Sequence, residues 1–159
     1  MLQTTYISKL RGQMLDYAEK RRDVIKAAGD ALHIAKRSIF AMHRDDMKEA
    51  KDKLQQSEKI LKDLHKKHKS NPALLEEGSM KEALEEFVEA CLLYNFLSKK
   101  GLGEIKGLSI PAEVFIGGLA DVPGELHRYS IKVATERNMK AAIECKEAAE
   151  EIVGTLIEF

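Results

Sequence analysis

The spacing of the apolar residues constrains this chain more than any other feature. Along nearly all of its 159 residues, apolar side chains recur every three or four positions, and proline occurs only three times. The pattern predicts an all-α protein of five or six helices, organised as one domain over residues 1–159. The main helices are expected near residues 4–43, 46–69, 79–99, 111–136 and 138–157.

Glycine and proline mark the places where these helices could be interrupted. Gly12 and Gly29 each cost about 1 kcal/mol relative to alanine inside a helix, so we expect a break or kink in the first helix. The helix over 111–136 contains three glycines and Pro123, and an interior proline costs roughly 3 kcal/mol and kinks a helix.

The charges are balanced overall but divided along the chain. Residues 1–69 hold 17 Lys and Arg against 10 Asp and Glu, whereas residues 70–159 hold 9 against 16. The whole-chain balance argues against an acidic tail or a basic arm. Any function proposed for the chain should explain why its two halves are oppositely charged.

Cellular location is suggested by what the sequence lacks. No apolar stretch is long enough for a membrane span, and the first residues lack the apolar block of a signal peptide. Cys91 and Cys145 are isolated within apolar helical patterns, which favours buried, reduced thiols and a cytoplasmic protein. Phosphate-binding glycine motifs are also absent from the sequence.

Two acidic pairs could carry chemistry. Glu86 and Glu89 are three residues apart and Asp121 and Glu125 four apart, so each pair shares one face of a helix. Asp121 has mostly apolar sequence neighbours, and a buried carboxylate usually needs a cation or a hydrogen-bond donor. If the helices meet, the oxygens suit Mg²⁺ or Mn²⁺, which can promote phosphodiester cleavage. Solvated helix faces are the alternative.

The histidines and basic residues could bind a metal ion or phosphates, or could simply be solvated. His65 and His68 have helical spacing, but the lysines around them favour a solvated basic face over a metal site. Glu-x-x-His, the motif of di-iron helical bundles, does not occur in the sequence. Lys36, Arg37 and Arg44 could neutralise phosphates or form another solvated face. Six aromatic residues could stack on bases, although most of the six are expected in the core: Tyr6, Tyr17, Phe40, Phe87, Tyr94 and Tyr129.

Three segments carry a likeness to a known family: AKRSIFAMHR (35–44), EEFVEA (85–90) and GGLADVPGELHR (117–128). They resemble the translin family, and within it the branch called translin-associated factor X. AKRSIFAMHR (35–44) resembles the SKRTIFLLHR segment of that branch, and EEFVEA (85–90) resembles its QEYVEA helix. GGLADVPGELHR (117–128) is similar to GVADLTGELMR, with Val122 and Pro123 in place of a Leu-Thr pair. The segments follow the family's order, and the likeness spans nearly the whole chain.

This resemblance implies a long-helix bundle that assembles into a hollow closed oligomer. The expected assembly is a homo-octamer, or a mixed assembly with a translin-type partner subunit. The resemblance also implies binding of RNA or single-stranded DNA. In the factor X branch it implies a metal-dependent endoribonuclease acting on single-stranded RNA.

The resemblance also assigns roles by position. Glu86, Glu89 and Asp121 would be the catalytic carboxylates and, with Glu125, would hold Mg²⁺ or Mn²⁺. Translin itself lacks the aspartate of this helix and binds nucleic acid without cleaving it. Two alternatives stay open: a translin-like oligomer that only binds RNA or single-stranded DNA, and a helical scaffold with opposed charged faces. The candidates for holding the phosphate backbone are Lys36, Arg37, Arg44 and Arg128.

Overall fold

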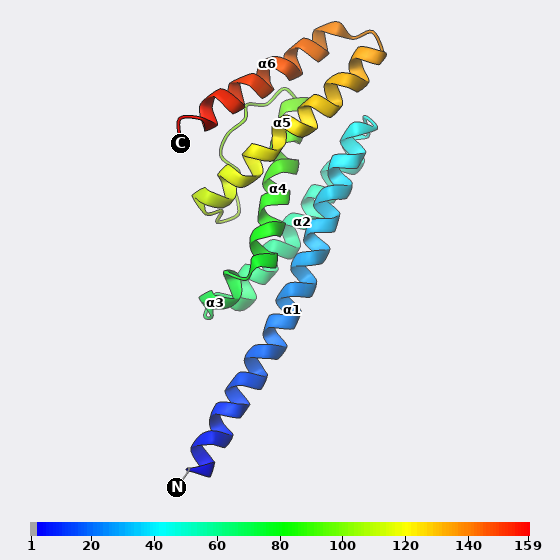
Figure 1. Cartoon of the computed structure of the whole chain (residues 1–159). Helices are drawn as coiled ribbons and strands as arrows, with labels where there is room; N and C mark the ends of the chain where they lie inside the picture. The colour runs from blue at the N-terminus through cyan, green and yellow to red at the C-terminus, as the bar shows by residue number, and fades with distance from the viewer. Residues whose placement is uncertain (1–2) are drawn as a thin grey trace.

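The computed structural model describes residues 3–159 as a set of helices, with no strand among them (Figure 1). This confirms the predicted all-α class, and the long helices end within a few residues of the predicted limits. A single turn, α3, lies inside the expected connector and begins at Pro72. The helices are α1 (Thr4–His43), α2 (Met47–His68), α3 (Pro72–Leu75), α4 (Gly78–Leu97), α5 (Ala112–Thr135) and α6 (Met139–Leu156).

The expected break in the first helix does not occur. α1 runs for 40 residues through Gly12 and Gly29, because the surrounding helix formers carry the cost of about 1 kcal/mol at each glycine. α5 likewise continues through Pro123, which cannot donate the backbone hydrogen bond that Leu119 would otherwise accept. Both acidic residues of the 121–125 pair therefore stay on one helix.

The helices pack around α4, which is the most buried of them. α1 packs along α2 and α4, and α5 lies across α4 and carries α6 on its other side (Figure 1). On α1 the buried positions include four alanines without exposed surface, which let the neighbouring helices approach closely. The fully buried side chains include Met42, Leu61, Leu74, Leu92, Leu93 and Leu126.

Two buried serines fix α1 against α2. The hydroxyl of Ser38 donates to the carbonyl oxygen of Ala50 at 2.9 Å, and that of Ser57 donates to the carbonyl oxygen of Ala31 at 2.9 Å. Both hydroxyls are thereby satisfied away from water. The two bonds hold the second half of α1 in a defined register, and this half faces α4.

The first half of α1 extends beyond the other helices (Figure 1). Over residues 3–23, only Leu10 and Tyr17 are partly buried; all the others are exposed, including several large apolar side chains. A second exposed apolar surface lies on α5 and α6 and includes Ile131, Met139 and Ile143. Contiguous exposed apolar surfaces are typical of contacts with another chain. In the described part of the chain, no helix is long and apolar enough to span a membrane.

The burial of the two thiols and of the two histidines differs in part from the sequence-based predictions. Cys145 is buried and Cys91 half-buried, and both are free thiols. The solvated face predicted for the histidines is wrong for His68, which is 3% exposed, and His65 is partly buried. His68 extends the buried stripe of α2 that includes Leu61 and Leu64, and burial lowers the pKa of its imidazole.

Candidate active site

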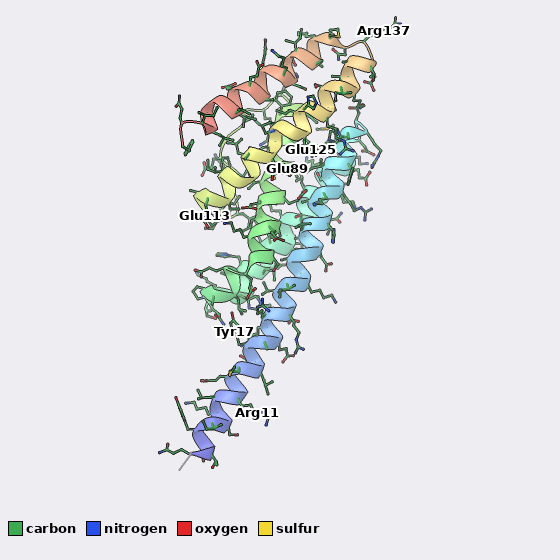
Figure 2. The ribbon with its side chains drawn as sticks, viewed as in Figure 1. Arg11, Tyr17, Glu89, Glu113, Glu125 and Arg137 are labelled. Carbon is green, nitrogen blue, oxygen red and sulfur yellow. The ribbon has the colours of Figure 1, made fainter. Side chains whose placement is uncertain are left out.

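The two acidic pairs meet where α1, α4 and α5 come together. Glu89 from α4 and Glu125 from α5 lie close to each other at this junction (Figure 2). Both line a pocket of about 230 Å³, with α1 forming its third side. The lining residues are Lys36, Ile39, Phe40, Glu86, Glu89, Glu125 and Arg128.

A glycine on α5 makes this meeting possible. A β-carbon at Gly118 would lie 2.6 Å from the carbonyl oxygen of Glu85 and 2.7 Å from the β-carbon of Val88. Only a residue without a side chain fits at so short a separation, so α5 rests with its backbone directly on α4. Asp121 and Glu125 follow Gly118 by three and seven residues and therefore lie on the side of α5 near the α4 carboxylates.

Glu89 is the buried carboxylate of the cluster. It is 8% exposed. Burial raises its pKa from an ordinary 4.5 to about 8, helped by the negative charges of Glu86, Asp121 and Glu125. Lys36 opposes this shift only weakly. Glu89 consequently keeps its proton at neutral pH unless a further positive charge enters the pocket.

Glu86 is partly buried and has a lysine nearby. Burial raises the pKa of Glu86, and Lys36 counters that rise, with its Nζ 3.6 Å from Oε2 of Glu86. Asp121 and Glu125 raise the pKa of Glu86 further through their charges. A single lysine, Lys36, therefore lowers the pKa values of two carboxylates in this cluster, Glu86 and Glu89.

Glu125 is held in the opposite protonation state by α1. The Nε2 of His43 donates a hydrogen bond to Oε2 of Glu125, and this bond lowers the pKa of Glu125. Arg128 Nη1 lies 3.9 Å from the same oxygen. The cluster therefore combines a protonated carboxyl at Glu89 with an ionised one at Glu125, a division of pKa values that is common where proton transfer or cation binding occurs.

The end of α1 is attached to α5 just beyond His43. Asp45 accepts a hydrogen bond from the hydroxyl of Tyr129 at 2.8 Å and pairs with Lys132. Lys132 holds the pKa of Asp45 below its usual range. These contacts keep His43 beside Glu125.

Asp121 is not in the environment that the sequence predicted. We expected a carboxylate in an apolar setting, but Asp121 is exposed and does not line the pocket. Val122 and Leu126 take the core side of α5, and Asp121 lies about 100° round the helix from Val122. Its charge still acts on Glu86 and Glu89, so it belongs to the rim of the cluster.

The predicted phosphate-binding residues separate into two groups. Lys36 and Arg128 line the pocket. Arg37 is exposed on another side of α1, and Arg44 pairs with Glu49 at 2.8 Å, so neither lines it. The structure adds His43, to which no role was assigned from the sequence. Its spacing of seven residues from Lys36, two helical turns, is the signal that would have placed it on this face.

The donor set suits a hard divalent cation in kind. Carboxylate oxygens are the ligands that Mg²⁺ and Mn²⁺ prefer, and the pKa of Glu89 is raised by burial and by the negative charges of its neighbours, which a cation would offset. Within residues 3–159, however, no three His, Cys, Asp or Glu side chains are already arranged to hold a metal ion. The contacts of Glu86 with Lys36 and of Glu125 with His43 and Arg128 all use Oε2, so they do not engage Oε1 of either carboxylate.

The fold is similar to those of three solved structures. The crystal structure of AfC3PO superposes with a TM-score of 0.89 at 26% identity, covering 97% of this chain and 80% of that one. The structure of an AfC3PO–duplex RNA complex gives 0.83 at 23% identity, covering 97% and 79%. The crystal structure of apo-NeC3PO gives 0.81 at 20% identity, covering 99% and 96%.

Sequence comparison identifies the family. Curated protein sequences give no significant match. The profile of the translin family matches residues 19–156, which is most of the chain and includes every residue that lines the pocket. The protein belongs to the translin family.

Proposed function

We propose that the protein is a metal-dependent endoribonuclease of the factor X type that acts on single-stranded RNA. The observation that carries this proposal is the meeting of Glu86, Glu89 and Glu125 in one pocket, with Asp121 at its rim and two basic side chains beside it. A plain binding protein has no need for a buried carboxylate in a pocket that receives phosphates. The similarity to AfC3PO, which has been solved with duplex RNA, supports RNA as the ligand.

In this proposal, the residues of the pocket hold either the cation or the phosphates of the strand. Glu86, Glu89 and Asp121 would hold the cation, with Glu125 as a further oxygen donor beside His43. Mg²⁺ or Mn²⁺, when bound, supplies Lewis-acid stabilisation of the charge that develops on the phosphodiester. Lys36 and Arg128 would hold phosphates of the strand, a role that is independent of sequence. Arg37 and Arg44 could contact phosphates only outside the pocket.

An oligomer of this chain is part of the proposal. The projecting half of α1 and the α5–α6 surface both expose large apolar side chains that a second copy could cover. A closed, hollow homo-octamer would enclose the pockets and admit only flexible strands. Native mass measurement tests the assembly, and a monomer at micromolar concentration would contradict it.

A specific observation favours one alternative. No metal-holding arrangement is formed within residues 3–159, and two of the carboxylates are paired with cationic groups. A translin-like oligomer that binds RNA or single-stranded DNA without cleaving it would have no need for a formed metal site.

Cleavage of labelled single-stranded RNA by the purified chain separates these functions. We expect internal cleavage with Mg²⁺ or Mn²⁺, none with EDTA, and slower cleavage of the same strand in a duplex. Binding that weakens steeply with salt but leaves the RNA intact under all conditions would favour the binding alternative. If the chain has no affinity for RNA at moderate salt, both functions would be contradicted, and a helical scaffold would be the remaining alternative.

A further inference from the structure

An exposed aromatic side chain stands at the carboxylate pocket. Phe40 lines the pocket on α1, one helical turn beyond Lys36, and 48% of its surface is exposed. The neighbouring Ile39 is 5% exposed, so the helix does bury its apolar side chains at this level. The phosphate-binding and cation-holding roles described above make no use of a phenyl ring.

The ring is paired with a second flat group. The guanidinium carbon of Arg128 lies 5.4 Å from the centre of the Phe40 ring, and the Arg128 side chain is itself 54% exposed. The same guanidinium is 3.9 Å from Glu125, so the pair borders the carboxylates directly. Aromatic rings and guanidinium planes are the two kinds of side-chain surface on which unpaired bases stack.

We propose that Phe40 and Arg128 form a stacking platform for one unpaired base of the substrate, next to the carboxylates that act on its backbone. The inference rests on the proposed function, since it takes RNA as the ligand of this pocket. Lys36 would hold the phosphate of the same strand one helical turn, about 6 Å, along α1.

The platform defines the substrate class. A base within a duplex is stacked on both faces and cannot lie on Phe40, whereas a base in a single strand, a loop or a frayed end can. Every base has a face on which to stack, so the platform would discriminate against paired RNA with little preference for sequence.

Binding of a short labelled oligoadenylate in EDTA tests the platform without interference from cleavage. We expect Phe40→Ala to weaken binding roughly 5- to 150-fold, the effect of losing one base–aromatic contact of about 1–3 kcal/mol. Phe40→Trp should bind at least as well as the wild type. Phe159→Ala is the matched control, because Phe159 is 85% exposed and outside the pocket. A backbone of the same length without bases should bind the wild type and Phe40→Ala equally.

Other outcomes would overturn the platform. Equal binding of oligoadenylate by the wild type and Phe40→Ala would remove the stacking role while leaving RNA binding intact. Weaker binding of the base-free backbone by Phe40→Ala, or a changed native mass, would make Phe40 a structural or subunit contact. Failure of the wild type itself to bind oligoadenylate would contradict the proposed function together with the platform.

Discussion

Replacing Glu89 by glutamine is expected to abolish metal-dependent cleavage of RNA while leaving the chain folded. Glutamine has nearly the same shape as glutamate but cannot supply a charged oxygen to a cation. Metal ions contribute several kcal/mol to stabilising charge in such reactions, so the rate should fall roughly 10³-fold or more. Affinity for RNA in EDTA should not fall, because Glu89 is already protonated in the metal-free pocket at neutral pH and glutamine leaves the charge there unchanged.

As the pH rises, the same substitution should make the metal-free chain increasingly more stable than the wild type. The folded chain keeps the Glu89 proton up to about pH 8, whereas the unfolded chain releases it near 4.5. Between these values the folded state binds more protons, so the free energy of unfolding of the wild type falls as pH increases, by on the order of 1 kcal/mol per pH unit. Glu89→Gln lacks this loss. Glu125, whose lowered pKa acts in the opposite direction, is present in both proteins.

Urea unfolding at pH 5 and pH 8, together with cleavage assays, measures both effects. Glu113→Gln is the matched control, because Glu113 is also on the pocket-forming helices but 73% exposed and distant from the carboxylates (Figure 2). The control should cleave normally and show the wild-type dependence on pH. A Glu89→Gln variant that cleaves at the wild-type rate would show that the buried carboxylate is not part of the reaction.

Gly118→Ala is expected to be the more damaging of two identical substitutions on α5. Its β-carbon would meet a backbone oxygen and a β-carbon of α4, neither of which can rotate away. The helices must separate, at a cost of about 1–3 kcal/mol in stability. The carboxylates of α5 would move with their helix, and a displacement of about 1 Å can lower a rate roughly 10²-fold.

Gly124→Ala provides the control within the same helix. A β-carbon at Gly124 meets nothing within 4 Å, so alanine should raise stability by up to about 1 kcal/mol through its higher helix propensity. Urea unfolding of the two variants should therefore move in opposite directions. Equal stability and equal cleavage in both would mean that the direct contact between α4 and α5 does not set the geometry of the pocket.

The helices and the pairing of acidic residues were predictable from local spacing alone. The apolar period placed the long helices, and the three- and four-residue separations placed each acidic pair on one face. The resemblance to the translin family then singled out these carboxylates among many others.

The three-dimensional details depend on contacts that local spacing does not encode. Which carboxylate is buried follows from how α5 is rotated on α4 at Gly118, and this makes Glu89 rather than Asp121 the buried one. His43 and Glu125 are 82 residues apart, so their hydrogen bond depends on where α1 ends relative to α5. Lys36 and Arg37 are adjacent in sequence, yet only Lys36 lines the pocket.

Cation binding at the carboxylates is the most direct test of the account. Titration of the RNA-free protein with Mn²⁺, followed by the electron paramagnetic resonance signal of the free ion, measures it in the wild type and in Glu89→Gln. We expect the wild type to bind Mn²⁺ and the variant to bind it more than roughly tenfold more weakly, since even the loss of an outer partner of a metal site has an effect of this size. Equal Mn²⁺ affinity in the two proteins, or no binding by either, would contradict the assignment of this pocket as a metal-dependent active site.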